Sequence, residues 1–233
     1  LNLNIMIDYF FANYSRKKLL NSTHLPKPLY HYLSQPLVEA KNLIKDIEFL
    51  VLDFETTGLD ASKEKIISIG YTVIKNFHVL SGTSRHILIN PKQELTEQNV
   101  AIHQLTDEEL KCGLPLSKAI DKLLSQMANR VIVVHFDKIE KGFLNQACHK
   151  LYQINTLPLI MLDTLKIERR KMQKMQQYTQ PDGLRLFNLR EKYNLPRYKA
   201  HNAMQDAIST AELFLAQVDY MGNKEAIKLR QLT

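Results

Sequence analysis

Hydrophobic and polar positions in the first half of the chain predict a series of strands. Apolar segments of strand length lie at 49–54, 66–74 and 84–89, and a turn is expected near Asn76. Because only short connections separate these segments, we expect them to form a three-strand antiparallel meander.

From residue 97 onward, helical periodicity alternates with short apolar runs. The expected helices cover 97–111, 115–128, 138–150, 163–177, 184–193 and 203–220, and the expected strands cover 131–135 and 159–162. Strands that are joined through helices usually run parallel to each other. We therefore expect an α/β fold with a mixed sheet, antiparallel in its first part and parallel in its second, flanked by helices.

Residues 1–46 depart from this pattern. They begin with a mixed aromatic and basic segment, and three prolines between 26 and 36 then interrupt the chain. The apolar stretch from Ile5 to Phe11 would form an unusual exposed patch if it were left in water. We expect residues 1–46 to be an extension that lies on the core or on a second subunit, followed by one domain at 47–222 and a tail at 223–233.

Composition narrows the class of protein. A chain of 233 residues with 45% hydrophobic residues can bury one core and is not a disordered protein. Lys and Arg total 31 against 24 Asp and Glu, which gives a net charge of +7. This charge suits a polyanionic substrate such as a nucleic acid, although many soluble proteins are modestly basic.

Cysteine usage and hydropathy bear on the compartment. Cys112 and Cys148 fit no metal-ligand spacing and are expected to be free thiols, which favours a reducing compartment. No apolar stretch reaches the roughly 18 residues of a membrane span. We expect a cytoplasmic protein without a membrane partner.

Two carboxylates lie at the end of the first expected strand, in the run VLDFETTG at 51–58. Residues two apart on a strand project to the same side of the sheet, so Asp53 and Glu55 share one face. Adjacent carboxylates repel unless a cation lies between them. The pair indicates a site for a hard, oxygen-preferring divalent cation such as Mg²⁺ or Mn²⁺, although two solvated acids at a strand end are the plainer interpretation.

A second group of polar residues lies near the C-terminus, in YKAHNAMQDAISTAELFL at 198–215. Small residues recur there every four positions, which allows the expected helix to pack closely on a sheet. Asp206 lies near the start of this helix and His201 in the loop before it. The acid could bind metal and the imidazole could act as a general base, although a lone histidine is more often a capping or surface residue.

Together these segments resemble the first and third motifs of the DEDDh, or DnaQ-like, 3′-to-5′ exonucleases. The resemblance rests on DFETTG at 53–58 and HNAMQDA at 201–207, and extends through NVAIHQLTDEEL at 99–110, LPLIMLDTLKIERR at 157–170 and FNLREKYNLPRYKAH at 187–201. Gln104 stands where the family has a glycine. The resemblance covers residues 49–220 and implies a ribonuclease H-like fold.

The second family motif departs from its usual form. In VVHFDKIEKGFL at 133–144, alignment on His135 and Phe143 places Glu140 where the family has an aspartate. The alternative acid, Asp137, keeps the usual residue type but needs a shift of three residues. We favour Glu140, because packing of the flanking residues fixes the register and a longer carboxylate can still reach a metal.

The resemblance implies metal-assisted hydrolysis of phosphodiesters at a 3′ end. In this interpretation Asp53, Glu55, Glu140 and Asp206 hold two divalent cations, Mg²⁺ or Mn²⁺, and His201 takes a proton from the attacking water. DNA is the expected substrate, and a polymerase or repair partner stays open. The alternatives are a 3′-to-5′ exoribonuclease, or a nucleic-acid-binding module with weak catalysis if Glu140 does not complete the site.

Further residues are candidates for contact with substrate. They are Thr56, Gly58, Leu59, His103, His135 and Phe136. For the last three a structural role is at least as well supported by the sequence. Lys166, Arg170 and Lys174 would share one helical face, which indicates either a track for a nucleic-acid backbone or a solvated charged surface.

Overall fold

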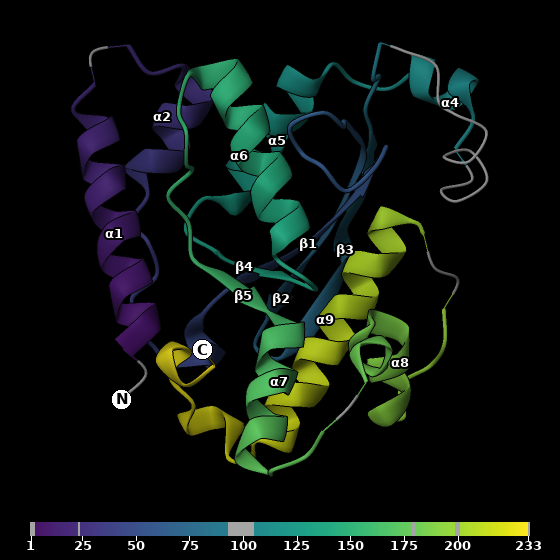
Figure 1. Cartoon of the computed structure of the whole chain (residues 1–233). Coiled ribbons are helices and arrows are strands. Elements are labelled where there is room, and N and C mark those ends of the chain that lie inside the picture. Colours follow the sequence, from purple (N-terminus) through teal and green to yellow (C-terminus); the bar gives the residue numbers. More distant parts are fainter. Residues whose placement is uncertain (1–2, 23, 93–104, 179, 199–200, 233) are drawn as a thin grey trace.

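A computed structural model describes residues 3–22, 24–92, 105–178, 180–198 and 201–232, with the side chains of 3–6, 8 and 107 excepted (Figure 1). Its centre is a five-stranded sheet in the order β3-β2-β1-β4-β5. The strands are β1 (Phe49–Thr56), β2 (Ile66–Lys75), β3 (His78–Leu88), β4 (Val131–Val134) and β5 (Met161–Asp163). The first three pair antiparallel, and β4 pairs parallel to both β1 and β5. The mixed sheet expected from the sequence is confirmed.

A two-residue turn joins β2 to β3. Asn76 and Phe77 both have positive φ, 49° and 61°, as in the turns whose twist matches paired strands. Pairing therefore resumes at once with Lys75 opposite His78. This makes β3 begin six residues before the segment expected at 84–89, because an exposed edge strand does not need an apolar run there.

Helices flank the sheet and follow the expected order. The helices are α1 (Leu3–Leu20), α2 (Lys27–Ser34), α4 (Asp107–Lys111), α5 (Leu116–Met127), α6 (Lys138–Tyr152), α7 (Thr164–Lys174), α8 (Leu186–Lys192) and α9 (Ala203–Tyr220), with 3₁₀ turns η1 (Ile44–Asp46), η2 (Pro181–Leu184), η3 (Lys224–Ala226) and η4 (Leu229–Gln231). The helix expected at 97–111 is seen only as α4, since 93–104 lie outside the described residues. Within the described residues, no helix is long and apolar enough to cross a bilayer.

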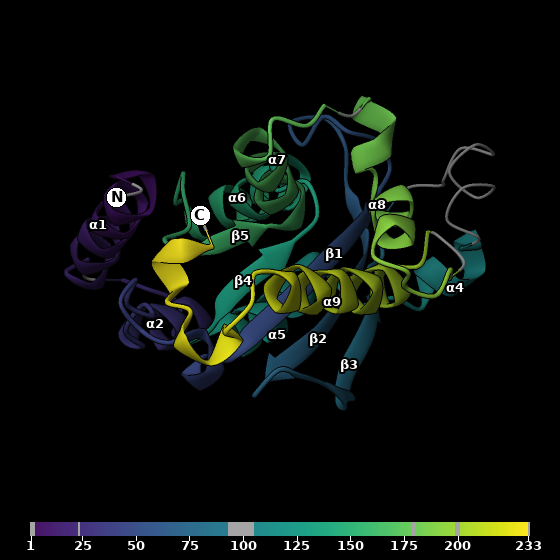
Figure 2. The ribbon, with the colours of Figure 1, turned by 90° about the horizontal axis from the view of Figure 1, so that it is seen from below.

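Two apolar layers enclose the sheet. One joins alternate residues of β1, Leu50 and Leu52, to α2, α5 and α6. The other joins Phe49 and Val51 to α7 and α9, and Figure 2 shows α9 running across that face. The two β1 acids follow Phe49 and Val51 in the same alternation, so they lie on the face that α9 covers.

The N-terminal extension folds as two helices on the core. In α2, Leu29 and Leu33 are fully buried. In α1, Tyr9 lies against the core, whereas Phe10 and Phe11 are 67% and 63% exposed. Among the side chains of this stretch that the structure describes, Tyr9 is thus packed on the core, whereas Phe10 and Phe11 are left exposed.

The C-terminal residues close over the extension. Leu43 pairs with Lys228, and the Ile44 amide donates to the Ile227 carbonyl at 2.9 Å. Leu229 is fully buried. The N-terminal extension and the C-terminal residues therefore meet next to the N-terminal end of β1, away from the end that carries Asp53. The domain boundaries, which place one domain at 47–222, stay a prediction.

Candidate active site

Strand β1 delivers its two acids at its carboxyl end. Asp53 is half-buried and Glu55 is 6% exposed. The strand continues to Thr56, where its pairing with β2 becomes irregular between Glu55 and Thr56. The acids therefore stand on rigid, paired backbone at the point where the sheet ends.

Helix α9 brings the third acid onto these two. Its N-cap is Asn202, whose side chain accepts a hydrogen bond from the Gln205 amide at 3.1 Å. Asp206 lies in the first turn, 8% exposed, and its Oδ2 accepts from the His201 amide at 2.9 Å. His201 is exposed with φ 69°, so a left-handed residue directs the chain into the helix.

A glycine permits this close approach. Gly70 pairs with Asp53 across the β1–β2 ladder. A Cβ added at Gly70 would lie 1.9 Å from the Ala203 carbonyl carbon, so the first turn of α9 rests directly on the strand backbone. No role at Gly70 was expected from the sequence. An isolated glycine inside an apolar strand is the signal that could have found it.

The three acids form one cluster. One carboxylate oxygen from each of Asp53, Glu55 and Asp206 lies within 4.8 Å of the other two. Burial, followed by the charges of the surrounding acids with Glu140 first, raises the pKa of Asp53 well above its usual range. Burial is also the main cause that raises the pKa of Asp206 to about 7.

Glu140 lies beside this cluster from the first turn of α6. It is 3% exposed, and burial raises its pKa to about 8. It is not one of the three residues within 4.8 Å. The Asp137 side chain is 15% exposed and is engaged elsewhere, since its Oδ2 accepts from Lys166 Nζ at 2.5 Å.

The donors fit a hard divalent cation. Among the described residues, Asp206 Oδ1 and Glu140 Oε2 are buried without a hydrogen-bond partner. Burying a carboxylate oxygen without a partner costs free energy, and a bound cation would offset that cost. Oxygen donors of this kind suit Mg²⁺ or Mn²⁺.

The turn that leads into α6 is held by Asp163, a residue to which the sequence analysis gave no role in the site. Its Oδ1 accepts from the Phe136 and Leu165 amides at 3.0 and 2.9 Å, and its Oδ2 accepts from the Asp137 amide at 3.2 Å. Phe136 has φ 77° and is 41% exposed. A left-handed conformation is unusual for an aromatic residue. Asp163 thus fixes the turn from which Glu140 is presented.

His135 is tied into the same turn. Its Nε2 donates to the Leu184 carbonyl at 3.0 Å, and its Nδ1 lies 2.7 Å from the Thr164 hydroxyl. Burial lowers its pKa. With both ring nitrogens engaged, His135 has a structural role, and its contact with substrate stays a prediction.

Three further candidates lie at or just after the end of β1. Thr56 is buried, and its hydroxyl donates to the Gly58 carbonyl at 2.7 Å. Leu59 is 81% exposed. His103 lies outside the described residues. The structure thus brings Thr56, Gly58 and Leu59 to the strand end that carries the acids.

Sequence comparison places the chain among nucleases. The model of a family described as "Exonuclease" matches residues 50–214. A PolC-type DNA polymerase III of Thermotoga petrophila is 31% identical over 185 residues, which are 79% of this chain and 13% of that protein. The Bacillus subtilis PolC-type enzyme is 26% identical over 176 residues, 76% of this chain and 12% of that protein. The chain spans about an eighth of these relatives.

Solved structures share the fold. The nuclease domain of 3′hExo, a DEDDh family member bound to rAMP, superposes with a TM-score of 0.63 at 12% identity, covering 79% of this chain and 97% of that one. E. coli exonuclease I with a dA16 oligonucleotide gives 0.62 at 16% identity, covering 75% and 43%. Exonucleases of this family use divalent metal ions. The chain belongs to the DEDDh exonuclease family, as its acidic motifs predicted.

Proposed function

We propose that this protein removes nucleotides from the 3′ end of DNA strands. The observation that carries the proposal is the cluster of Asp53, Glu55 and Asp206, with ligand oxygens within 4.8 Å of one another on rigid elements. Two comparisons support a DNA substrate. The relatives are DNA polymerases, and one structural neighbour holds a DNA strand.

The acidic cluster is the proposed metal centre. Asp53, Glu55 and Asp206 would hold two divalent ions, Mg²⁺ or Mn²⁺, with Glu140 as the fourth acid. Bound there, such ions would polarise the scissile phosphate and offset the charge that develops on the leaving oxygen. The buried, unpartnered oxygens of Asp206 and Glu140 support this assignment.

His201 is the proposed general base. Its side chain is exposed in the loop before α9, and the bond from its amide to Asp206 fixes this loop relative to the acids. Water attacks phosphorus, the bond from phosphorus to the 3′ oxygen of the shortened strand breaks, and a nucleoside 5′-monophosphate leaves. His201 takes the proton of the attacking water, and the leaving oxygen is protonated by solvent.

The strand end beyond β1 is the proposed seat of the terminal nucleotide. Thr56 and the Gly58 backbone border it, and Leu59 offers an exposed apolar side chain for packing against a base. Phe136 offers an exposed ring at the start of α6. His135 and His103 complete the set of proposed contacts.

A 5′-labelled single strand of DNA tests the proposal, with an RNA strand of the same sequence in parallel. We expect a ladder that shortens one nucleotide at a time with Mg²⁺ or Mn²⁺ and no cleavage with chelator. Asp206→Asn should abolish the ladder. Asp219→Asn, an exposed acid on the same helix, should not. Shortening of RNA alone would replace DNA as substrate, and cleavage that persists in Asp206→Asn would contradict the metal centre.

A further inference from the structure

A small basic cavity lies beside the C-terminal half of α7, whereas the acidic cluster lies near the N-terminal end of α9. It has a volume of about 250 Å³ and is bordered by α7, the end of α9 and the C-terminal turn. Its lining residues are Ile167, Arg170, Lys171, Lys174, Met175, Tyr220, Met221, Gln231 and Leu232. Three of the nine are cationic and none is acidic, so the cavity is complementary to an anion.

Two of these cations lack a direct partner among the residues that the structure describes. Arg170 is half-buried, and burial lowers its pKa more than the charge of Asp163 raises it. Within the described part of the chain, neither its guanidinium nor the Lys174 ammonium has a hydrogen-bond or ion-pair partner. Lys171 is different, because its ammonium lies 3.1 Å from the Tyr193 hydroxyl and 3.9 Å from Glu168. A half-buried guanidinium without an acceptor is stabilised by an anion that enters the cavity.

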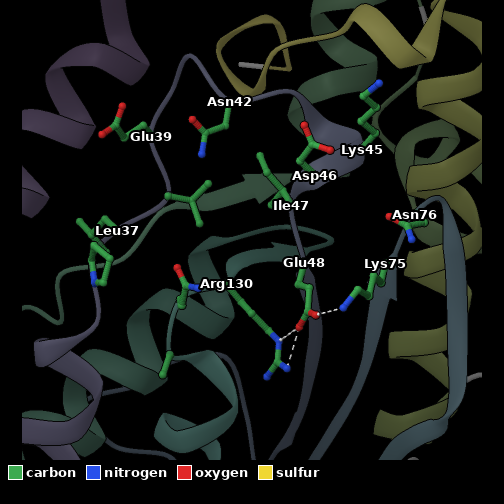
Figure 3. Close-up of a pocket in the computed structure, with 14 residues that line it drawn as sticks. Leu37, Glu39, Asn42, Lys45, Asp46, Ile47, Glu48, Lys75, Asn76 and Arg130 are labelled. Atoms are coloured by element: carbon green, nitrogen blue, oxygen red, sulfur yellow. Dashed lines mark hydrogen bonds and ion pairs between the residues drawn. The ribbon is translucent and has the colours of Figure 1, made fainter.

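The cations of another cavity show the contrast. A hollow of about 560 Å³ next to the N-terminal end of β1, opposite the end that carries the acids, is lined in part by Lys75 and Arg130. Figure 3 shows Glu48 between them, with Arg130 Nε and Nη2 donating to one carboxylate oxygen at 3.0 and 2.9 Å and Lys75 Nζ to the other at 2.8 Å. Lys75 and Arg130 thus form direct ion pairs, whereas Arg170 and Lys174 form none among the described residues.

The cavity also has an apolar side. Tyr220 is 62% exposed and Met175 is 47% exposed. Exposed aromatic and thioether surfaces next to cations suit a nucleotide, whose phosphate meets the cations while its sugar or base lies on the apolar groups. A free inorganic anion would use the cations alone.

We propose that this cavity is an accessory site for the backbone of a single-stranded nucleic acid whose 3′ end occupies the acidic cluster. The proposal rests on the proposed function and adds a second contact to it. From Asp206 to Tyr220, helix α9 spans about 21 Å. A dinucleotide is too short to reach across that span, whereas a strand of about 16 nucleotides is long enough. Lys166, which pairs with Asp137, lies one turn of α7 before Arg170.

Strand length separates this site from the active site. Arg170→Gln with Lys174→Gln removes two charges while keeping most of each aliphatic stem. The matched control is Lys118→Gln with Lys122→Gln, which removes two exposed charges from α5 on the opposite face of the sheet. KM and kcat are measured with Mg²⁺ on thymidine oligomers of two and about 16 nucleotides, over a series of salt concentrations.

We expect the Arg170 and Lys174 variant to raise KM for the long strand about fivefold at unchanged kcat, and to leave dinucleotide hydrolysis unaltered. The slope of log KM against log salt should fall by about 1.4, since two phosphate contacts are lost. The control variant should behave as the native protein does. An equal rise in the control, a rise for the dinucleotide as well, or no rise at all would overturn the accessory site.

Binding without hydrolysis keeps this test independent of the proposed function. Fluorescence anisotropy of the labelled long strand in chelator should show weaker binding by the Arg170 and Lys174 variant than by its control. Equal binding would overturn the site even in a protein that does not cleave. Thymidine monophosphate should compete poorly with the strand, and equal competition would assign the cavity to free nucleotides instead. If the native protein cleaves neither length, the proposed function fails separately.

Discussion

At the scale of single residues, the second-motif acid is the sharpest test of the site. Glu140 is buried beside Asp53, whereas Asp137 is partly buried and paired with Lys166. We expect Glu140→Gln to lower kcat by roughly 100-fold or more, because a ligand-side charge is lost, and Asp137→Asn to lower it by less than about threefold. Steady-state kinetics on one DNA strand measures both. The reverse order would place the metal-site acid at Asp137.

Asp163 carries the second prediction at this scale. It accepts three backbone amides, including those of Phe136 and Asp137 that start α6. Asp163→Ala should lower the free energy of unfolding by about 2–3 kcal/mol, because buried donors lose their acceptor, and should lower kcat as Glu140 shifts.

The isosteric change provides the control for Asp163. Asp163→Asn keeps one acceptor oxygen. Its free energy of unfolding, measured with urea, and its kcat should therefore both lie between those of the native protein and of Asp163→Ala. A loss of stability in Asp163→Ala without any change in kcat would show that the turn does not position Glu140.

At the scale of elements, the packing of α9 on β2 decides whether the acids meet. Gly70→Ala would place a methyl group 1.9 to 2.2 Å from backbone atoms of Ala203 and Met204. The first turn of α9 must then move, so we expect a loss of about 1–3 kcal/mol of stability together with most of the activity. Gly82→Ala in β3 meets nothing within 4 Å and is the matched control. Full activity in a folded Gly70→Ala protein would contradict the role of this contact.

Prediction from sequence succeeded where a pattern is local. The alternation in β1 placed Asp53 and Glu55 on one face, and the Asn76 turn and the α9 segment were found from their own residues. It missed features that depend on distant partners. Gly70 matters only because α9 crosses β2, and the role of Asp163 depends on amides 26 and 27 residues away. The helices of the extension were missed because prolines interrupt it and α1 has apolar residues on all sides.

At the scale of the whole molecule, the acids should make stability depend on pH and on metal. Burial raises the folded pKa of Asp206 to about 7 and of Glu140 to about 8, whereas unfolded carboxyls titrate near 4. Between those values the folded state binds more protons than the unfolded state, so metal-free stability falls as pH rises. We expect a lower Tm in chelator at about pH 8 than at about pH 6.

Divalent metal should oppose this fall, because it binds the deprotonated acids. The rise in Tm on adding Mg²⁺ or Mn²⁺ should be larger at the higher pH. Asp206→Asn should flatten the pH dependence and reduce the metal effect. If Tm changed with pH by the same slope in the native and Asp206→Asn proteins, the pH dependence would originate outside the acidic cluster.

Titration calorimetry with Mn²⁺ is the most direct test that the acidic cluster is a metal centre, since it needs no turnover. Metal-free native protein should bind two Mn²⁺ ions in the presence of a strand whose 3′-terminal phosphodiester resists hydrolysis. Asp206→Asn should bind fewer or bind them at least tenfold more weakly, while Asp219→Asn should match the native protein. Undiminished Mn²⁺ binding by Asp206→Asn, or none by the native protein, would contradict the account.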